Sequence, residues 1–218
     1  MTEGERVLPL FPLEQVVLFP GMSLPLRIFE ERYKVMIGAC QVTDQLFGVL
    51  LIRTGSEVGE PAQPERVGCT ARMLRVDRLP DGQMLILTVG EQRFRLQGPA
   101  RAMAEGYLVG DIRLLPDPPS EPVAVDLVTS IAAEFGKYQT AARSFQRSGS
   151  GEPFKPPALP TDPLRLSYQI ASTLGVHPRE RQHLLELDDV ATRLQQELTL
   201  LRRENRPGPE AIGPFSRN

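Results

Sequence analysis

The sequence predicts an α+β fold, in which an N-terminal antiparallel β pseudo-barrel with one short helix precedes an α-helical bundle. Short apolar runs bounded by turn signals fill the first half of the chain, as is typical of many short strands. Beyond the proline-dense stretch 116–122, apolar residues recur at three- and four-residue spacing, the period of amphipathic helices. We therefore expect a β-barrel domain at residues 1–118, a helical domain at residues 119–206 and a disordered tail at residues 207–218.

Proline-spaced apolar runs open the chain, and a short helix follows them. We expect strands within Val7–Leu13 and Val16–Phe19, a tight turn at Pro20-Gly21 and a third strand after it. Because proline cannot donate to a central sheet ladder, these should be edge strands or strand ends. Helical spacing of apolar residues then predicts an amphipathic helix over Glu30–Ala39.

Further strand regions follow the first helix. Asp81-Gly82 predicts a hairpin, and we expect Gly90–Gln92 to turn the chain again. The run after the hairpin is apolar on both faces, which predicts a central strand. The predicted strand regions are Phe47–Ile52, Val67–Leu79, Met84–Val89, Arg93–Gln97 and Tyr107–Leu115.

Four helices are predicted in the second half. The first spans Val123–Phe145, and a Ser-, Gly- and Pro-rich loop near 147–160 follows it. Thr161-Asp162-Pro163 is an N-cap pattern that opens a helix ending near Gly175, and Pro178 opens a short one. The last helix begins near Asp188-Asp189, where carboxylates favour the positive helix end. Its apolar stripe comprises Leu187, Val190, Leu194, Leu198 and Leu201.

The proline-spaced segment also resembles a known family. Leu8-Pro9-Leu10-x-Pro12-Leu13, Val17-Leu18-Phe19-Pro20-Gly21-Met22 and Pro25-Leu26-x-Ile28-Phe29-Glu30-x-Arg32-Tyr33 are similar to the start of the Lon protease N-terminal substrate-binding domain. Later stretches continue the likeness, among them Gly68-x-Thr70-Ala71, Gly90-x-x-Arg93-Phe94-Arg95 and Arg181-Gln182-x-Leu184-Leu185-Glu186. The resemblance covers about residues 6–205. It implies a PUA-like pseudo-barrel and a domain that binds polypeptides.

Catalytic motifs are missing from the sequence. In the full protease, ATPase and Ser-Lys peptidase modules would follow this domain, but we find no P-loop. The lysines, Lys34, Lys137 and Lys155, show no nucleophile partner in the pattern. We therefore expect a non-catalytic protein without a cofactor.

The net charge, the histidines and the cysteines limit which other functions are expected. A net charge of −2 and the absence of a long apolar run favour a cytoplasmic protein that binds neither membrane nor nucleic acid. The resemblance to the Lon domain implies a bacterial protein. Two histidines, His177 and His183, and two cysteines, Cys40 and Cys69, lack zinc-site spacing, so we expect no metal. Both thiols should be buried and reduced.

Large apolar residues near turns are the expected peptide-binding site, with Phe19 and Met22 the best candidates for exposure. The residues are Phe11, Phe19, Met22, Phe29, Tyr33 and Met36. The expected partners are unfolded or degron-bearing polypeptides, in protein quality control, bound by a monomer or weak homodimer.

Other functions stay open. A basic face on the strands could bind RNA phosphates, although no aromatic residue interleaves to stack bases. This face comprises Arg72, Arg75, Arg78, Arg93 and Arg95. The stripe of the last helix could support an oligomerising structural role. A small-molecule enzyme would need a deep pocket with converging titratable groups.

Overall fold

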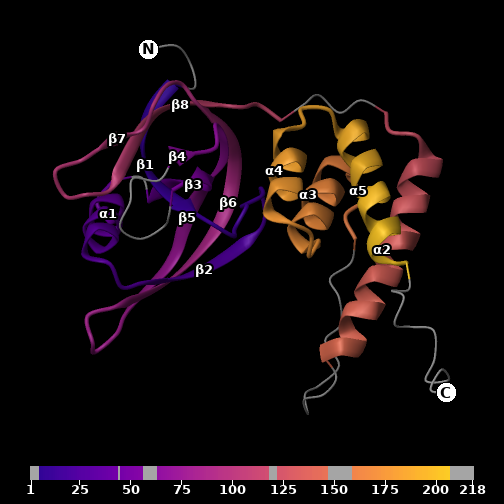
Figure 1. Ribbon diagram of the computed structural model, residues 1–218, viewed down its shortest axis with the longest axis horizontal. Helices are drawn as coiled ribbons and strands as arrows, with labels where there is room; N and C mark the ends of the chain where they lie inside the picture. The colour runs from indigo at the N-terminus through magenta and orange to yellow at the C-terminus, as the bar shows by residue number, and fades with distance from the viewer. Residues whose placement is uncertain (1–4, 44, 56–62, 118–121, 147–158, 207–218) are drawn as a thin grey trace, which may run out of the picture. The chain divides into compact units, whose positions relative to one another are not determined.

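The computed structural model describes residues 5–43, 45–55, 63–117, 122–146 and 159–206 (Figure 1). Most of the predicted loop near 147–160 and the predicted tail at 207–218 lie outside the described residues. The chain forms two compact units, which are described separately. The first combines the described residues up to 117 with 168–188, and the second combines 122–146 and 159–167 with 189–206. The sequence suggested a border near residue 118 but not the return of residues 168–188 to the first unit.

A closed sheet forms the first unit. Pairing of β6 with β8 closes a ring of β1, β3, β5, β6 and β8, to which β2, β4 and β7 add at the edges. Among the described strands only β1 and β3 pair in parallel. This confirms the predicted α+β fold with a mainly antiparallel barrel. The elements are β1 (Glu5–Leu13), β2 (Ser23–Ile28), α1 (Glu31–Gln41), β3 (Leu46–Thr54), β4 (Gln63–Pro64), β5 (Val67–Arg78), β6 (Met84–Leu96), β7 (Arg101–Ala102) and β8 (Leu108–Leu114).

Prolines lie in strands where one side is not paired. In β1, residues 5–10 pair with β8 and residues 10–13 pair with β3. Pro9 therefore has a partner only on β8, and Pro12 has one only on β3, so β1 lies inside the ring and accommodates both. In β2, Pro25 lies in an end strand that pairs only with β6 among the described strands. The prediction of edge strands or strand ends thus holds for β2 and for Pro12 near the end of β1, but it is wrong for Pro9, which lies inside β1.

Strand β6 is continuous through Gly90, so the predicted turn at Gly90–Gln92 is wrong. The turn at Pro20-Gly21 lies against β6 instead: the Gly21 amide donates to the Gly90 oxygen at 2.8 Å, and the Gly90 amide donates to the Met22 oxygen at 2.9 Å. A Cβ at position 90 would lie 2.2 Å from the Phe19 carbonyl oxygen. Glycine is therefore required for this close approach. The segment before the turn, Val16–Phe19, was predicted as a strand and is irregular.

Helical residues 168–188 attach to the barrel through polar side chains that reach main-chain oxygens. Gln182 of α4 (Pro178–Glu186) donates to the Val67 oxygen at 3.0 Å. Arg181 donates to the Val17 oxygen at 3.1 Å. Helix α4 begins as predicted, because the His177 Nδ1 accepts the Arg179 amide hydrogen at 3.2 Å. These bonds satisfy buried main-chain groups at the point of attachment.

The second unit contains α2 (Val125–Gln146), α5 (Val190–Glu204) and the first turn of α3 (Pro163–Thr173). Asp189 caps α5 by accepting the Thr192 amide hydrogen at 2.5 Å. Four residues of the predicted apolar stripe, Val190, Leu194, Leu198 and Leu201, are buried on α5, which packs against α2, so they offer no exposed surface to a second copy. The fifth, Leu187, is half-buried and precedes the helix. The core of the second unit comprises Ile131, Phe135, Leu166, Leu194, Leu198 and Leu201.

Candidate polypeptide-binding surface

Most of the residues that the sequence suggested for peptide binding lie in the barrel core. Phe11, Tyr33 and Met36 are buried, and the rings of Phe11 and Tyr33 lie 4.2 Å apart. The expected exposure of Phe19 is wrong, because its side chain is 0% exposed. The Phe19 ring lies 6.5 Å from the Tyr168 ring and 5.8 Å from the Arg181 guanidinium. These four residues therefore stabilise the fold and cannot contact a ligand in this conformation.

Two of the six suggested residues reach the surface. Phe29 directly follows β2 and is 57% exposed. Met22 is half-buried, and its Sδ lies 3.8 Å from Arg181 Nη2. Phe29 therefore remains available for contact with a ligand.

A different set of apolar residues is exposed on the outside of the barrel. In the first half of β6, buried and exposed residues alternate: Met84 and Ile86 face the core, whereas Leu85 and Leu87 are 43% and 40% exposed. In a strand with one wet face the outward positions are usually polar. Leu85 and Leu87 therefore form an apolar surface at positions where polar residues would be usual.

Neighbouring strands extend this apolar surface. Pro25 of β2 lies directly opposite Leu87, and cross-strand partners share one face of a sheet. On the other side, the register of β5 shifts between Met73 and Arg75, and Leu74 at this irregularity is 57% exposed. We call this region the outer leucine surface and define it as Pro25, Leu74, Leu85 and Leu87.

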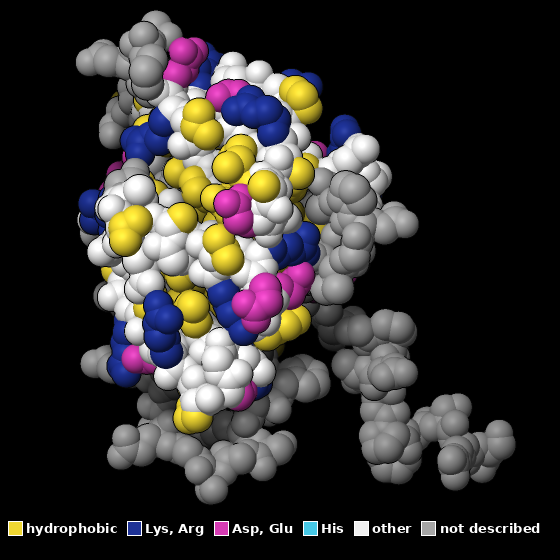
Figure 2. Space-filling view, turned by 90° about the vertical axis from the view of Figure 1, so that its left-hand side faces the viewer, with side chains coloured by type: hydrophobic (Ala, Val, Ile, Leu, Met, Phe, Trp, Pro, Cys, Tyr) yellow, Lys and Arg dark blue, Asp and Glu magenta, His cyan; other side chains and the backbone are white. Residues whose placement is uncertain are grey.

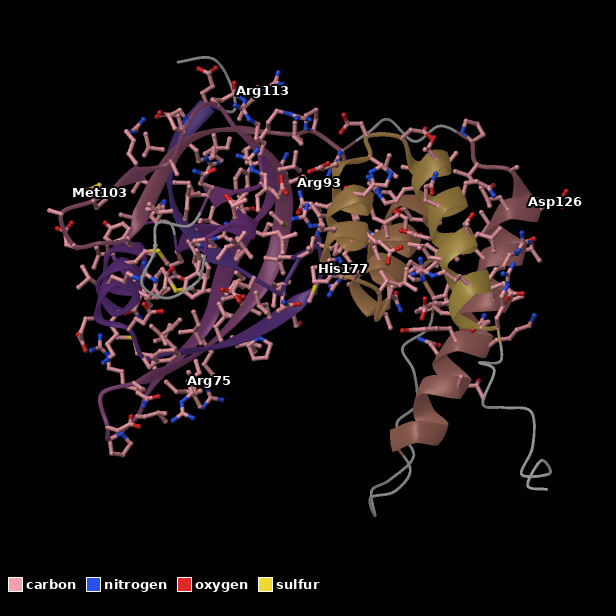
Figure 3. All side chains as sticks on the ribbon, viewed as in Figure 1. Arg75, Arg93, Met103, Arg113, Asp126 and His177 are labelled. Carbon is pink, nitrogen blue, oxygen red and sulfur yellow. The ribbon has the colours of Figure 1, made fainter. Side chains whose placement is uncertain are left out.

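Charged side chains of both signs border the outer leucine surface. Arg27 lies opposite Leu85 and donates from Nε to the Gln83 side-chain oxygen at 2.6 Å. Arg75 lies opposite Leu87 and donates from Nε to Asp77 at 2.9 Å. Figure 3 shows Arg75 extending from β5 away from the barrel. An apolar centre with a mixed polar rim is the common anatomy of protein-binding surfaces.

The free edge of β2 is only partly able to pair with another strand. The Met22 oxygen accepts the Gly90 amide hydrogen of β6, and in an antiparallel pair every second residue directs its main-chain groups at the partner strand. The main-chain groups of Ser23, Pro25 and Arg27 therefore point to the side of β2 that faces away from β6. Pro25 has no amide hydrogen, so it interrupts the row of donors at its centre. Side chains of the outer leucine surface therefore offer a better contact than the strand edge.

The suggested arginine face does not form one exposed surface. Arg93 is 1% exposed and donates to the main-chain oxygens of Leu185 and Leu187. Arg72 forms an ion pair with Glu91, and Arg75 forms one with Asp77. Arg78 is exposed and Arg95 is half-buried. The arrangement thus lacks the shared basic stripe on which the RNA-binding alternative depended.

Hydrophobic side chains are also visible at the barrel end that carries α1 (Figure 2). Val35 and Val42 of this region are exposed, as is Met103, which Figure 3 places at the same end. Lysine, arginine and acidic side chains lie among the hydrophobic ones on this face in Figure 2. Scattered apolar residues of this kind are ordinary on soluble domains.

The cysteines and the possible metal ligands among the described residues offer no reactive centre. Cys40 and Cys69 are free and buried, as predicted, and burial raises the pKa of the Cys69 thiol well above its ordinary value. Within the described ranges no group of three or more His, Cys, Asp or Glu side chains could hold a metal ion. None of the described helices is long and apolar enough to cross a membrane.

The sequence contained a signal for the outer leucine surface. The run Met84–Val89 is apolar on both faces and correctly predicted a central strand, since β6 pairs with β2, β5 and β8. The prediction missed that the outward face would stay in contact with solvent. Only the arrangement of the whole sheet shows which face is covered.

The family model and similar curated proteins both relate this chain to Lon proteases. Residues 7–203 match the family described as the ATP-dependent protease La (LON) substrate-binding domain. The Lon protease of Roseiflexus castenholzii is 30% identical over 205 residues, which cover 91% of this chain and 24% of that protein. The Lon protease of Rhizobium meliloti is 27% identical over 198 residues, with 90% and 24% covered. The chain thus spans about a quarter of the length of these relatives.

Solved structures agree with this relationship. A Lon N-terminal domain protein from Xanthomonas campestris superimposes with a TM-score of 0.66 at 28% identity, covering 89% of this chain and 98% of that one. The N-terminal domain of the Mycobacterium avium complex Lon protease shares the fold, with a TM-score of 0.60 at 17% identity and 90% and 98% covered. The chain belongs to the LON substrate-binding domain family.

Proposed function

We propose that this chain is a non-catalytic polypeptide-binding module, which holds apolar segments of unfolded proteins on the outer leucine surface. The observation that carries the proposal is the exposure of Leu85 and Leu87 on the outward face of β6. Membership of a substrate-binding family favours a polypeptide as the ligand. Capture of unfolded segments is a step of cytoplasmic protein quality control, and we place the chain there.

The chemistry of the surface favours extended apolar segments over folded partners. Leu74, Leu85 and Leu87 offer flexible aliphatic contacts without a fixed pattern of hydrogen-bond donors. The rim supplies both charge signs through Arg27, Arg75 and Asp77, so it does not require one sign on the ligand. Such a surface would bind many apolar sequences weakly.

The test is a fluorescence anisotropy titration with a labelled synthetic peptide rich in Leu and Phe. We expect the double variant Leu85→Ser/Leu87→Ser to weaken binding at least about 10-fold, because each leucine would contribute roughly 1 kcal/mol of apolar contact. A matched peptide with serine in place of its apolar residues should bind neither protein. Unchanged affinity of the double variant would refute the surface.

A control variant removes apolar area elsewhere. Val42→Ser at the C-terminal end of α1 replaces another highly exposed apolar residue outside the outer leucine surface. It should bind the peptide as tightly as the unchanged protein. If Val42→Ser weakens peptide binding as much as Leu85→Ser/Leu87→Ser does, the peptide adheres non-specifically and there is no defined binding surface.

A further inference from the structure

A pocket of about 550 Å³ opens on the barrel away from the outer leucine surface, with which it shares no residue. Its walls come from β3, β4, β6, β7, β8 and the connections between them. The described residues that line it are Arg53, Gln63, Pro64, Arg66, Leu96, Gly98, Pro99, Ala100, Ala102 and Leu108. Its volume lies within the range of about 300–1,000 Å³ that is usual for sites binding small groups.

The lining combines positive charge with an apolar wall. Two arginines, Arg53 and Arg66, are among the lining residues, and none of the described residues that line the pocket is acidic. Arg53 is oriented by Gln63, to which its Nη2 donates at 3.3 Å. The apolar wall includes Leu96 and Leu108. A group that fits both features carries a carboxylate next to an apolar body.

We infer that this pocket binds the C-terminal residue of a polypeptide, with its apolar side chain on the wall and its α-carboxylate on Arg53 and Arg66. This inference rests on the proposed function, because it takes the ligand to be a polypeptide. The end of a chain is the place where a carboxylate lies directly beside an apolar side chain. Guanidinium groups match a carboxylate geometrically, since each can donate two parallel hydrogen bonds to it.

The pocket therefore adds selectivity to the outer leucine surface. Leu85 and Leu87 would accept apolar segments wherever they occur in a chain, whereas Arg53 and Arg66 would favour segments that end in an apolar residue. Chains that expose such ends, for example after cleavage, would bind more tightly than intact ones with buried ends.

Isothermal titration calorimetry of the full chain tests the inference with two Leu- and Phe-rich peptides of one sequence ending in leucine. One peptide has a free C-terminal carboxylate and the other a C-terminal amide. We expect the free acid to bind about 10-fold more tightly, the effect of one charge-assisted carboxylate contact. Arg53→Gln/Arg66→Gln should bind both peptides equally. Arg113→Gln, which removes an exposed arginine of β8 outside the pocket (Figure 3), should keep the preference.

The outcomes separate the two proposals. Equal binding of acid and amide by the unchanged protein would overturn the pocket inference and leave the proposed function standing. A preference that persists in Arg53→Gln/Arg66→Gln would also overturn it. Binding of neither peptide would overturn both. A competition titration with octanoate gives a further outcome. If octanoate displaces the free-acid peptide and binds more tightly than that peptide, the pocket is a fatty-acid site and the inference is overturned.

Discussion

Arg93 on strand β6 donates from Nη1 to the main-chain oxygen of Leu185 on α4 at 2.9 Å, across 92 residues of sequence. The same nitrogen lies 2.9 Å from the Leu187 oxygen, and Nη2 lies 3.1 Å from Asp188. A single buried side chain therefore satisfies the carbonyl groups at the C-terminal end of α4. These contacts fix residues 168–188 to the barrel.

Replacing Arg93 tests this attachment. We expect Arg93→Met to lower the free energy of unfolding by about 3 kcal/mol, because the buried Leu185 oxygen and the partly buried Leu187 oxygen lose their charged donor. Urea titration followed by circular dichroism measures the change. Arg78→Met, which alters an exposed arginine at the end of β5, should stay within about 0.5 kcal/mol of the unchanged protein. Matching midpoints for the two variants would contradict the role of Arg93.

Gly90 should tolerate no side chain. A Cβ there would lie 2.2 Å from the Phe19 oxygen, so Gly90→Ala must displace main-chain atoms of the Pro20-Gly21 turn. We expect a loss of about 2 kcal/mol or more in the free energy of unfolding, measured by thermal and urea unfolding.

Gly38→Ala is the matched control for this substitution. Gly38 lies inside α1, and no atom lies within 4 Å of the added Cβ. Alanine should therefore stabilise the protein by about 0.5–1 kcal/mol, since it lowers the entropy of the unfolded chain. Opposite signs for the two glycines are expected, and a harmless Gly90→Ala would mean that the turn does not pack on β6.

Glu197 should make the second unit less stable as the pH rises. Its carboxyl group is buried on α5, and neither oxygen has a hydrogen-bond partner among the described residues. Burial raises its pKa well above the ordinary value, and the charge of Arg193 opposes this only in part. The folded chain therefore keeps a proton that the unfolded chain releases above about pH 4.3.

The sign of the effect follows from that proton. Stability from Glu197 is fully present below its unfolded pKa and is lost as pH rises toward the folded pKa. Glu197→Gln should thus unfold at a temperature that changes less between acid and neutral pH. Thermal unfolding at several pH values measures this. Glu204→Gln, on the exposed end of the same helix, should follow the unchanged protein.

Local patterns in the sequence predicted the elements whose causes are local. The start of α4 at Pro178 and the turn at Pro20-Gly21 depend on neighbours a few residues away, and both occur where they were expected. The central position of β6 also followed from its apolar composition.

Contacts between distant segments could not be predicted in this way. The sequence predicts a turn at Gly90 because the pattern does not reveal the approach of Phe19, seventy-one positions earlier. The sequence pattern predicts that Arg93 lies on the surface, but α4 covers it in the folded chain. For the same reason Phe19 is buried although exposure was expected, and Leu85 is exposed on a strand expected to be covered on both faces. Exposure depends on which segment covers a face, and periodicity alone does not specify that segment.

The most direct test of the outer leucine surface maps the bound peptide by NMR. Amide signals of the ¹⁵N-labelled chain are recorded while the unlabelled amidated Leu- and Phe-rich peptide is added. We expect the largest shifts in β2, β5 and the first half of β6, centred on Leu74, Leu85 and Leu87, and none of comparable size at Val35 and Val42. Shifts concentrated on α1, or binding without shifts in β6, would contradict the assignment of the surface.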